Sequence, residues 1–370
     1  MPLSKIQTTN NQVIPNLGRR NIVINGAAQV AQRATSVTGL GASGGFFTVD
    51  RFKMDFAGSA GRFTMSQSTD APEGFGNSIK LDCTTADTSI AAGEIALFQY
   101  MFEGQDLQRF KKGTSNAEKF TLSFYVKGNG NATYVYELYD NDNARQISKT
   151  FSVTSSWTRV SLTYDGDTTG AFDDDNQLSL YAQIWLHAGS NYTSGTLSDS
   201  WSSVTQANRA VGISSFYSST DNEFYITGLQ LEVGDTATDF EHRSFAEELQ
   251  LCKRYFQILF DKGHQYHANA GFIYQTNSAS TQVHFPVEMR TDPAATRVGT
   301  LENSSGGFVG ASSWSIYYSG SWRGCSLCQT TDISANSMRL DFNAHSGMTN
   351  GGACGIYAGS GSYFELNAEI

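Results

Sequence analysis

Residues 224–257 read FYITGLQLEVGDTATDFEHRSFAEELQLCKRYFQ, and this stretch decides the fold. It begins with apolar residues that alternate over 229–233, which is the pattern of a strand with one buried face. An acidic turn follows, and Ser244 with Glu247 forms an S-x-x-E capping box that predicts the start of a helix. We therefore predict the last strand of one β-domain, followed by a single connecting helix over 244–258.

The predicted helix is apolar on two sides, so it has more than one surface to bury. The first apolar stripe has a four-three-four spacing and consists of Phe245, Leu249, Cys252 and Phe256. The second stripe consists of Leu251, Tyr255 and Ile258. Two interpretations follow: the helix packs between two β-domains of one chain, or one stripe meets its copies around an oligomer axis.

The chain on both sides of the helix has the two-residue periodicity of antiparallel strands with one buried face. Before the helix the alternation is clearest over 119–127, 158–164 and 177–187. With the weaker signals these segments make roughly ten strands, enough for a two-sheet jelly roll. The fold class is therefore all-β. The predicted parts are a polar N-terminal arm (1–20), a jelly roll (21–243), the helix (244–258) and a smaller C-terminal β-sandwich domain (259–370).

Composition and charge argue against several classes of partner. The net charge is −10, and basic residues form no cluster larger than Arg19-Arg20 or Lys111-Lys112, so we expect neither a nucleic-acid partner nor an anionic membrane surface. No apolar run approaches the roughly 18 residues that span a bilayer, and the N-terminus lacks the apolar core of a signal peptide. The five cysteines are odd in number and sparse, which favours reduced thiols over a disulfide framework.

The opening stretch also carries a family resemblance. GLQLEVGDTATDFEHRSFAEELQLCKRYFQ (228–257) closely resembles a segment of bacteriophage tail-fibre and virion structural proteins, where it links a carbohydrate-binding-module-like jelly roll to a C-terminal β-domain. NIVINGAAQVAQRATSVTG (21–39) resembles the opening of that family, SSWTRVSLTYDGDTTGAF (155–172) its middle, and HFPVEMRTDPAAT (284–296) the start of its terminal domain. The N-terminal MPLSKIQ resembles the starts of phage fibres.

The resemblance implies a virion protein that attaches to the particle by its N-terminal arm and contributes to adhesion at the host surface. It implies a homo-oligomer, and specifically a homotrimer. The partners that it implies are other tail or capsid proteins and a host-surface glycan. A capsid decoration or head fibre without a receptor role is one alternative. A glycan-cleaving depolymerase is another.

Two aromatic clusters are candidate carbohydrate sites, because sugar rings stack on aromatic faces and their hydroxyls bond to amides. On the strand 177–187, the face opposite the core carries Tyr181, Gln183, Trp185 and His187. A loop, another strand or a neighbouring subunit covering this face is the alternative. The second cluster, in a Ser/Gly-rich run that we predict to be a recognition loop, consists of Trp314, Tyr317, Tyr318 and Trp322. Packing in the core of the small domain is the alternative there.

Signals for a metal ion are weak. Residues 165–170 form the D-x-D-x-x-G of a calcium loop, but Asn176 stands at the twelfth position, where an EF-hand needs glutamate, so a solvated acidic turn is favoured. Jelly rolls of the resembled family hold structural calcium in some cases, and Asp50 and Glu232 are the candidate ligands for such an ion.

Motifs for catalysis are absent from the sequence. The pair Cys325 and Cys328 forms a C-x-x-C without the second pair that a zinc site needs. The chain contains no G-x-S-x-G, H-E-x-x-H, Walker A or Rossmann glycine motif. We therefore expect no enzyme, no catalytic residues and no cofactor.

Overall fold

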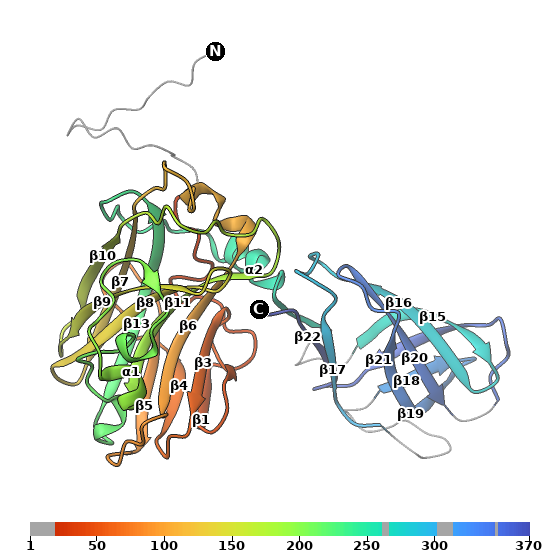
Figure 1. Ribbon diagram of the computed structural model, residues 1–370. Helices are drawn as coiled ribbons and strands as arrows, with labels where there is room; N and C mark the ends of the chain where they lie inside the picture. Colours follow the sequence, from red (N-terminus) through yellow and green to blue (C-terminus); the bar gives the residue numbers. More distant parts are fainter. Residues whose placement is uncertain (1–18, 261–265, 302–313, 345–346) are drawn as a thin grey trace. The chain divides into compact units, whose positions relative to one another are not determined.

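The described residues form two compact units, and the chain passes from the first to the second between Glu248 and Leu249. The computed structural model describes residues 19–260, 266–301, 314–344 and 347–370 (Figure 1). Residues 1–18, which carry nearly all of the predicted attachment arm, lie outside the described residues.

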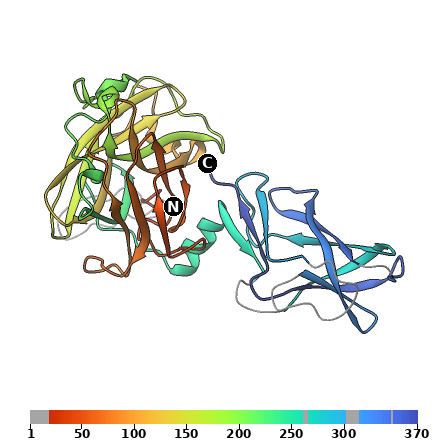
Figure 2. The same cartoon turned by 90° about the horizontal axis from the view of Figure 1, so that it is seen from below.

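The first unit consists of two antiparallel sheets, which the views in Figures 1 and 2 show from two sides. The six-stranded sheet has the order β1 (Ser36–Leu40), β4 (Arg62–Ser68), β5 (Ser78–Thr85), β13 (Glu223–Val233), β7 (Phe120–Gly128), β10 (Thr158–Tyr164). The seven-stranded sheet has the order β12 (Ser202–Ser203), β9 (Arg145–Val153), β8 (Ala132–Asp140), β11 (Leu178–Ala188), β6 (Ile95–Glu103), β3 (Phe52–Ala57), β2 (Gly45–Phe46). Short helices lie in the connections: α1 (Ser190–Thr193), η1 (Gly104–Asp106), η2 (Gln108–Phe110), η3 (Gln206–Asn208) and η4 (Phe216–Ser218).

The two sheets share one apolar core. Phe124 of the six-stranded sheet and Tyr136 of the seven-stranded sheet are both fully buried, and their rings lie 5.2 Å apart. From β5 onward the chain crosses from one sheet to the other at most connections, as it does in a jelly roll. The predicted jelly-roll sandwich is confirmed, and so are the alternating segments that predicted it.

The second unit is also all-β. Six strands form a closed barrel in the order β15 (Tyr266–Gln275), β16 (Ser278–His284), β20 (Ser337–Ala344), β19 (Ser321–Thr331), β18 (Trp314–Tyr318), β21 (Ala353–Ala358). A separate sheet has the order β14 (Phe256–Leu259), β22 (Tyr363–Asn367), β17 (Ala294–Val298). The expected β-domain is therefore present, but its main sheet closes on itself instead of forming a sandwich, because β15 pairs with both β16 and β21.

The connecting helix α2 spans Phe245–Lys253, which is shorter than predicted. Its start is as expected, since the Ser244 hydroxyl accepts a hydrogen bond from the Glu247 amide at 3.2 Å. Its end differs, because Phe256 is the first residue of β14 and pairs with the strand β22 near the C-terminus. The prediction of a helix up to residue 258 is thus wrong, and Phe256 does not share a helical stripe with Phe245 and Leu249.

Within the described residues, no helix is long and apolar enough to cross a membrane. On α2, Cys252 is buried, Leu249 is half-buried and Phe245 is 56% exposed. The role of this helix as a joint between domains or subunits stays a prediction.

Candidate functional site

The outer face of the seven-stranded sheet carries the first predicted carbohydrate site. Strand β11 points Ala182 and Ile184 into the core, so Tyr181 and Gln183 project from the opposite face. The register of the sheet places Gln183 opposite Gln99 of β6 on one side. On the other side, the register places Glu137 of β8 opposite Gln183.

A pocket of about 210 Å³ lies on this face, and we call it the Tyr181 pocket. Its lining comes from β3, β6, β8, β11 and the segment 192–209: Asp55, Ile95, Leu97, Gln99, Tyr139, Tyr181, Gln183, Trp185, Tyr192, Gln206 and Arg209. The half-buried rings of Tyr139 and Tyr181 stack with centroids 5.7 Å apart and planes inclined by 28°. Two larger hollows on the same unit lack this tyrosine pair.

A row of buried amide and carboxylate groups forms the floor of the Tyr181 pocket. Gln99 Nε2 donates to Gln183 Oε1 at 2.7 Å, and Gln183 Nε2 donates to Glu137 Oε2 at 2.5 Å. Arg209 binds both oxygens of Glu137, at 2.8 and 2.9 Å, so the charge of this fully buried carboxylate is compensated. The row fixes the floor rigidly, because each member is held by its neighbour.

Two features of this floor bear on ligand binding. The Gln99 Oε1 atom is buried and has no hydrogen-bond partner among the described residues, so it is an acceptor without a donor. The guanidinium of Arg209 lies 5.0 Å from the ring centres of both Tyr139 and Trp185, which holds those aromatic planes in place.

The structure separates the four residues predicted on β11. Tyr181, Gln183 and Trp185 line the pocket together, as expected for one face of a strand. Trp185 is only 1% exposed, because a small apolar cluster that includes Ala210 covers its ring. His187 is fully buried outside the pocket, and its Nδ1 atom lies 2.7 Å from Ser215 Oγ. The alternative of a covering loop is therefore correct for the end of this strand.

The sequence predicted only three of the lining residues, and among those missed are Gln99, Tyr139 and Arg209, together with Glu137 beneath them. The strand ATYVYELYD (132–140) alternates, so Glu137 and Tyr139 could have been placed on one face, but its pairing with β11 has no local signal. Arg209 follows a short 3-10 helix in a connection, and nothing in the sequence indicates that it reaches Glu137.

The second aromatic cluster lies on a β-hairpin, not on the loop we predicted. Strands β18 and β19 are antiparallel neighbours joined by a tight turn, and their register places Tyr318 opposite Ser321. Trp314 belongs to the barrel core and Tyr318 packs against that core. Tyr317 and Trp322 lie side by side with ring centres 4.8 Å apart. The alternation of β18 splits the cluster between two faces, so the four residues form no common site.

The acidic loop 165–170 contains an internal cation. The buried Lys112 ammonium lies 2.6 Å from Asp140 Oδ2 and 3.2 Å from Asp167 Oδ2. It also donates to the carbonyl oxygens of Thr169 and Gly170 at 2.9 and 2.7 Å. Asp165 instead forms an exposed ion pair with Lys119, so the loop is only in part the solvated turn that we predicted.

The two candidate calcium ligands have separate partners. Asp50 accepts hydrogen bonds from the backbone and side chain of Gln32, and Glu232 accepts three from Gln230 and Thr238. Neither belongs to a metal-like group of side chains within the described residues. A structural calcium ion therefore stays a prediction.

Cys325 and Cys328 are free and buried in the barrel core. Burial raises the pKa of both thiols, so they stay protonated at neutral pH. Their environment is that of apolar core side chains.

Comparison with known proteins identifies no family, since no family model and no curated protein matches the chain. Among solved structures, the chain is similar to the enzymatically active domain of tailspike protein 4 from bacteriophage CBA120, at 13% identity and a TM-score of 0.30. That match covers 58% of this chain but only 22% of the tailspike structure, so the chain spans about a fifth of its length.

The chain is also similar to two carbohydrate-binding modules. One is the family 11 module of Clostridium thermocellum, solved with a β-1,3-1,4-mixed-linked tetrasaccharide, at 10% identity and a TM-score of 0.27 over 56% of this chain and 99% of that one. The other is TmCBM61, solved with β-1,4-galactotriose, at 8% identity and a TM-score of 0.28 over 58% and 99%.

One expectation is corrected by these comparisons. We expected no enzyme, because the sequence contains no catalytic motif. The similarity to an enzymatically active tailspike domain contradicts that expectation. The expectation rested on local motifs, which detect only some active sites, because paired carboxylates on separate strands leave no local signature.

Proposed function

We propose that the jelly roll binds a glycan in the Tyr181 pocket and that the protein is an adhesive component of a phage virion. The observation that carries the glycan proposal is the combination of a stacked, half-buried tyrosine pair with the amide side chains of Gln99 and Gln183 in the lining of the same pocket. The C–H face of a sugar ring packs on aromatic faces, and polar groups around it fix the orientation of the ligand.

The charges around the pocket favour a neutral glycan. Arg209 is committed to Glu137 by two hydrogen bonds, so it does not offer its charge to an acidic sugar. Asp55, at the edge of the same pocket, adds negative charge. The volume of about 210 Å³ lies below the roughly 300–1,000 Å³ of drug-sized pockets, which fits a short saccharide or the end of a chain.

The test of the glycan proposal is binding of the full chain to a glycan array, followed by calorimetry on the best ligand. Tyr181→Ala is expected to weaken binding at least tenfold, because it removes one ring of the stacked pair. Tyr274→Ala is the matched control, since Tyr274 is an accessible tyrosine on the barrel, and it should leave the affinity unchanged. Reducing ends released from the bound glycan are measured in parallel, which separates binding from cleavage.

Either of two results would overturn the glycan proposal. One is the absence of any bound glycan on the array. The other is a Tyr181→Ala variant that is folded by circular dichroism and binds as tightly as the original chain.

The virion part of the proposal is supported by the resemblance of residues 228–257 to phage fibre and virion proteins. It predicts a homotrimer with three times the chain mass of 40.3 kDa in light scattering. Phe245→Asp is expected to lower that mass if α2 lies at the oligomer axis, since Phe245 is 56% exposed in a single chain. Immunogold labelling of particles then tests the location, and labelling of neither tail nor head would contradict it.

A further inference from the structure

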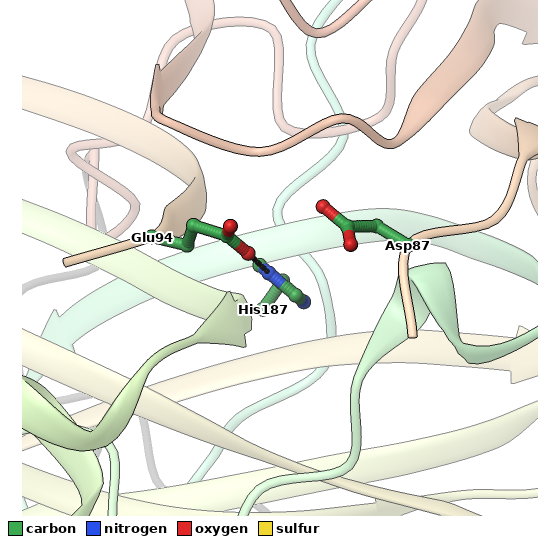
Figure 3. Close-up of side chains that lie close together, drawn as sticks. All are labelled: Asp87, Glu94 and His187. Carbon is green, nitrogen blue, oxygen red and sulfur yellow. Dashed lines mark hydrogen bonds and ion pairs between the residues drawn. The ribbon is translucent and has the colours of Figure 1, made fainter. Parts of the chain in front are cut away.

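Three buried side chains with metal-binding atoms converge at one end of the jelly roll: Asp87, Glu94 and His187, which we call the His187 cluster (Figure 3). Their ligand atoms all lie within 4.8 Å of one another. The side chains are 6%, 7% and 0% exposed, respectively. Asp87 and Glu94 lie on the connection between β5 and β6, and His187 lies near the end of β11, so the cluster joins two separate parts of the fold.

The charges of the His187 cluster are not balanced by other side chains. In the part of the chain that the structure describes, neither carboxylate pairs with a lysine or an arginine, and His187 Nε2 lies 3.1 Å from Glu94 Oε2. Asp87 accepts hydrogen bonds from Ser59 Oγ at 2.9 Å and from the Ala60 amide at 2.7 Å, which favour its ionised form. Burying two carboxyl groups around one imidazole costs desolvation free energy, which a bound cation would offset.

The second nitrogen of the imidazole is already positioned for a ligand role. His187 Nδ1 lies 2.7 Å from Ser215 Oγ, whose oxygen also accepts from the Tyr217 amide. When Nε2 gives up its proton and Nδ1 donates to Ser215, the Nε2 lone pair on the Glu94 side becomes available to a metal ion. Metal-bound histidines are held in the same way, with the far ring nitrogen donating to a polar neighbour.

We propose that the His187 cluster binds a divalent transition metal of the zinc type. The donors are His187 Nε2 and one carboxylate oxygen each from Glu94 and Asp87, with a water molecule completing four-coordination. One nitrogen and two carboxylates suit zinc, whereas calcium and magnesium prefer oxygen ligands alone. Binding displaces the proton from Nε2 to solvent.

The metal would act on the fold independently of the Tyr181 pocket. It ties the connection that carries Asp87 and Glu94 to β11, and through β11 to the seven-stranded sheet. We therefore expect zinc to raise the melting temperature of the jelly roll, and we expect this rise whether or not a glycan binds.

The first experiment titrates Zn²⁺ into full-length protein that has been stripped with a chelator and dialysed. We expect one equivalent to bind in calorimetry and the melting temperature to rise. Co²⁺ in place of Zn²⁺ should give the visible d–d absorption of a four-coordinate site. Failure of the stripped protein to take up any Zn²⁺ would overturn the proposal.

The variant Glu94→Gln separates a metal site from a purely structural hydrogen bond. Glutamine still accepts the Nε2 proton of His187, so a structural role predicts no change. The metal proposal predicts Zn²⁺ binding at least tenfold weaker, loss of the zinc-dependent rise in melting temperature, and a metal-free protein no less stable than the original. Unchanged zinc affinity in Glu94→Gln would refute the proposal even if His187→Gln fails to fold.

His284→Gln is the matched control, because His284 is an exposed histidine on barrel strand β16. It should leave the zinc affinity and the zinc-dependent melting shift unchanged. If it removes the bound equivalent instead, the zinc sits on the surface and the His187 cluster is not the site.

Discussion

The ammonium group of Lys112 lies where a metal ion would lie in an acidic loop. Two carboxylates and two carbonyl oxygens surround it, and the rings of Phe172 and Trp201 lie 5.2 and 5.3 Å from it. The sequence 165–170 looks like part of a calcium loop because the same oxygen donors serve either cation. Only the structure reveals which cation is present, since Lys112 is more than fifty residues away in the chain.

Replacing Lys112 by methionine should be strongly destabilising. The change leaves Asp140 and Asp167 buried without their shared cation, and loss of one partner of a buried pair costs about 3–5 kcal/mol. Urea denaturation measures the free energy of unfolding. Lys111→Met is the control, because Lys111 pairs with Glu118 in an exposed position, where pairs contribute about 0–1 kcal/mol. Equal losses in the two variants would contradict this account of the loop.

Asp167 should make the stability depend on pH at the acid end. Burial raises the pKa of Asp167, but hydrogen bonds from Arg145 and the Thr169 amide, with the charge of Lys112, bring it below the ordinary 3.8. A carboxyl with a lowered folded pKa stabilises the protein above its unfolded pKa, and this contribution is lost as pH falls through the folded value. Melting temperatures between pH 7 and pH 2 should therefore fall less steeply in Asp167→Asn than in the exposed control Asp174→Asn. Parallel curves for the two variants would show that Asp167 does not contribute.

At the scale of single elements, side-chain alternation was a reliable guide where strands are long and half-buried. Strands β7, β10 and β11 match the predicted segments closely, because each has an apolar face on the core. The predicted helix was too long, because the aromatic and branched residues of 255–259 continue its apolar pattern. In the structure, residues 256–259 instead form a strand that pairs with β22. The side-chain pattern alone cannot distinguish the last turn of a helix from a short strand when the partner strand lies far away in the sequence.

The hairpin β18–β19 was missed because serine and glycine were interpreted as loop formers. At Ser319 and Gly320 the φ angles are 49° and 79°, and two positive values in a two-residue turn define the type I′ turn that joins adjacent antiparallel strands. The same two residues that suggest a loop are therefore the ones that let the hairpin close.

Gly320 should tolerate asparagine but not valine. A Cβ atom at this position meets nothing within 4 Å, so any cost comes from the backbone alone. Gly320→Val forces a branched residue into positive φ and should lower the free energy of unfolding by about 1–3 kcal/mol. Gly320→Asn should cost less, because asparagine visits the left-handed region. Both are compared by urea denaturation, and equal stability of the two variants would rule out the turn as the cause.

At the scale of the whole molecule, the candidate sites depend on contacts that no local pattern encodes. The Tyr181 pocket combines side chains from four strands and the segment 192–209, and the His187 cluster combines β11 with the β5–β6 connection. The sequence could place Tyr181, Gln183 and Trp185 on one face because they share a strand. Gln99 and Arg209 could not be added, since their positions depend on which strands become neighbours.

The two units have separate apolar cores, and this separation makes a prediction about cooperativity. Phe124 belongs to the sandwich core and Phe342 to the barrel core, and both are fully buried. Truncating either ring to alanine should cost its own unit about 3–5 kcal/mol, because a buried cavity replaces the ring. Hydrogen exchange followed by mass spectrometry reports on each unit separately. Phe124→Ala should speed exchange in β7 and its neighbours but not in the barrel, and Phe342→Ala should do the reverse. Faster exchange in both units from either change would show that the chain unfolds as one cooperative block and would contradict the prediction.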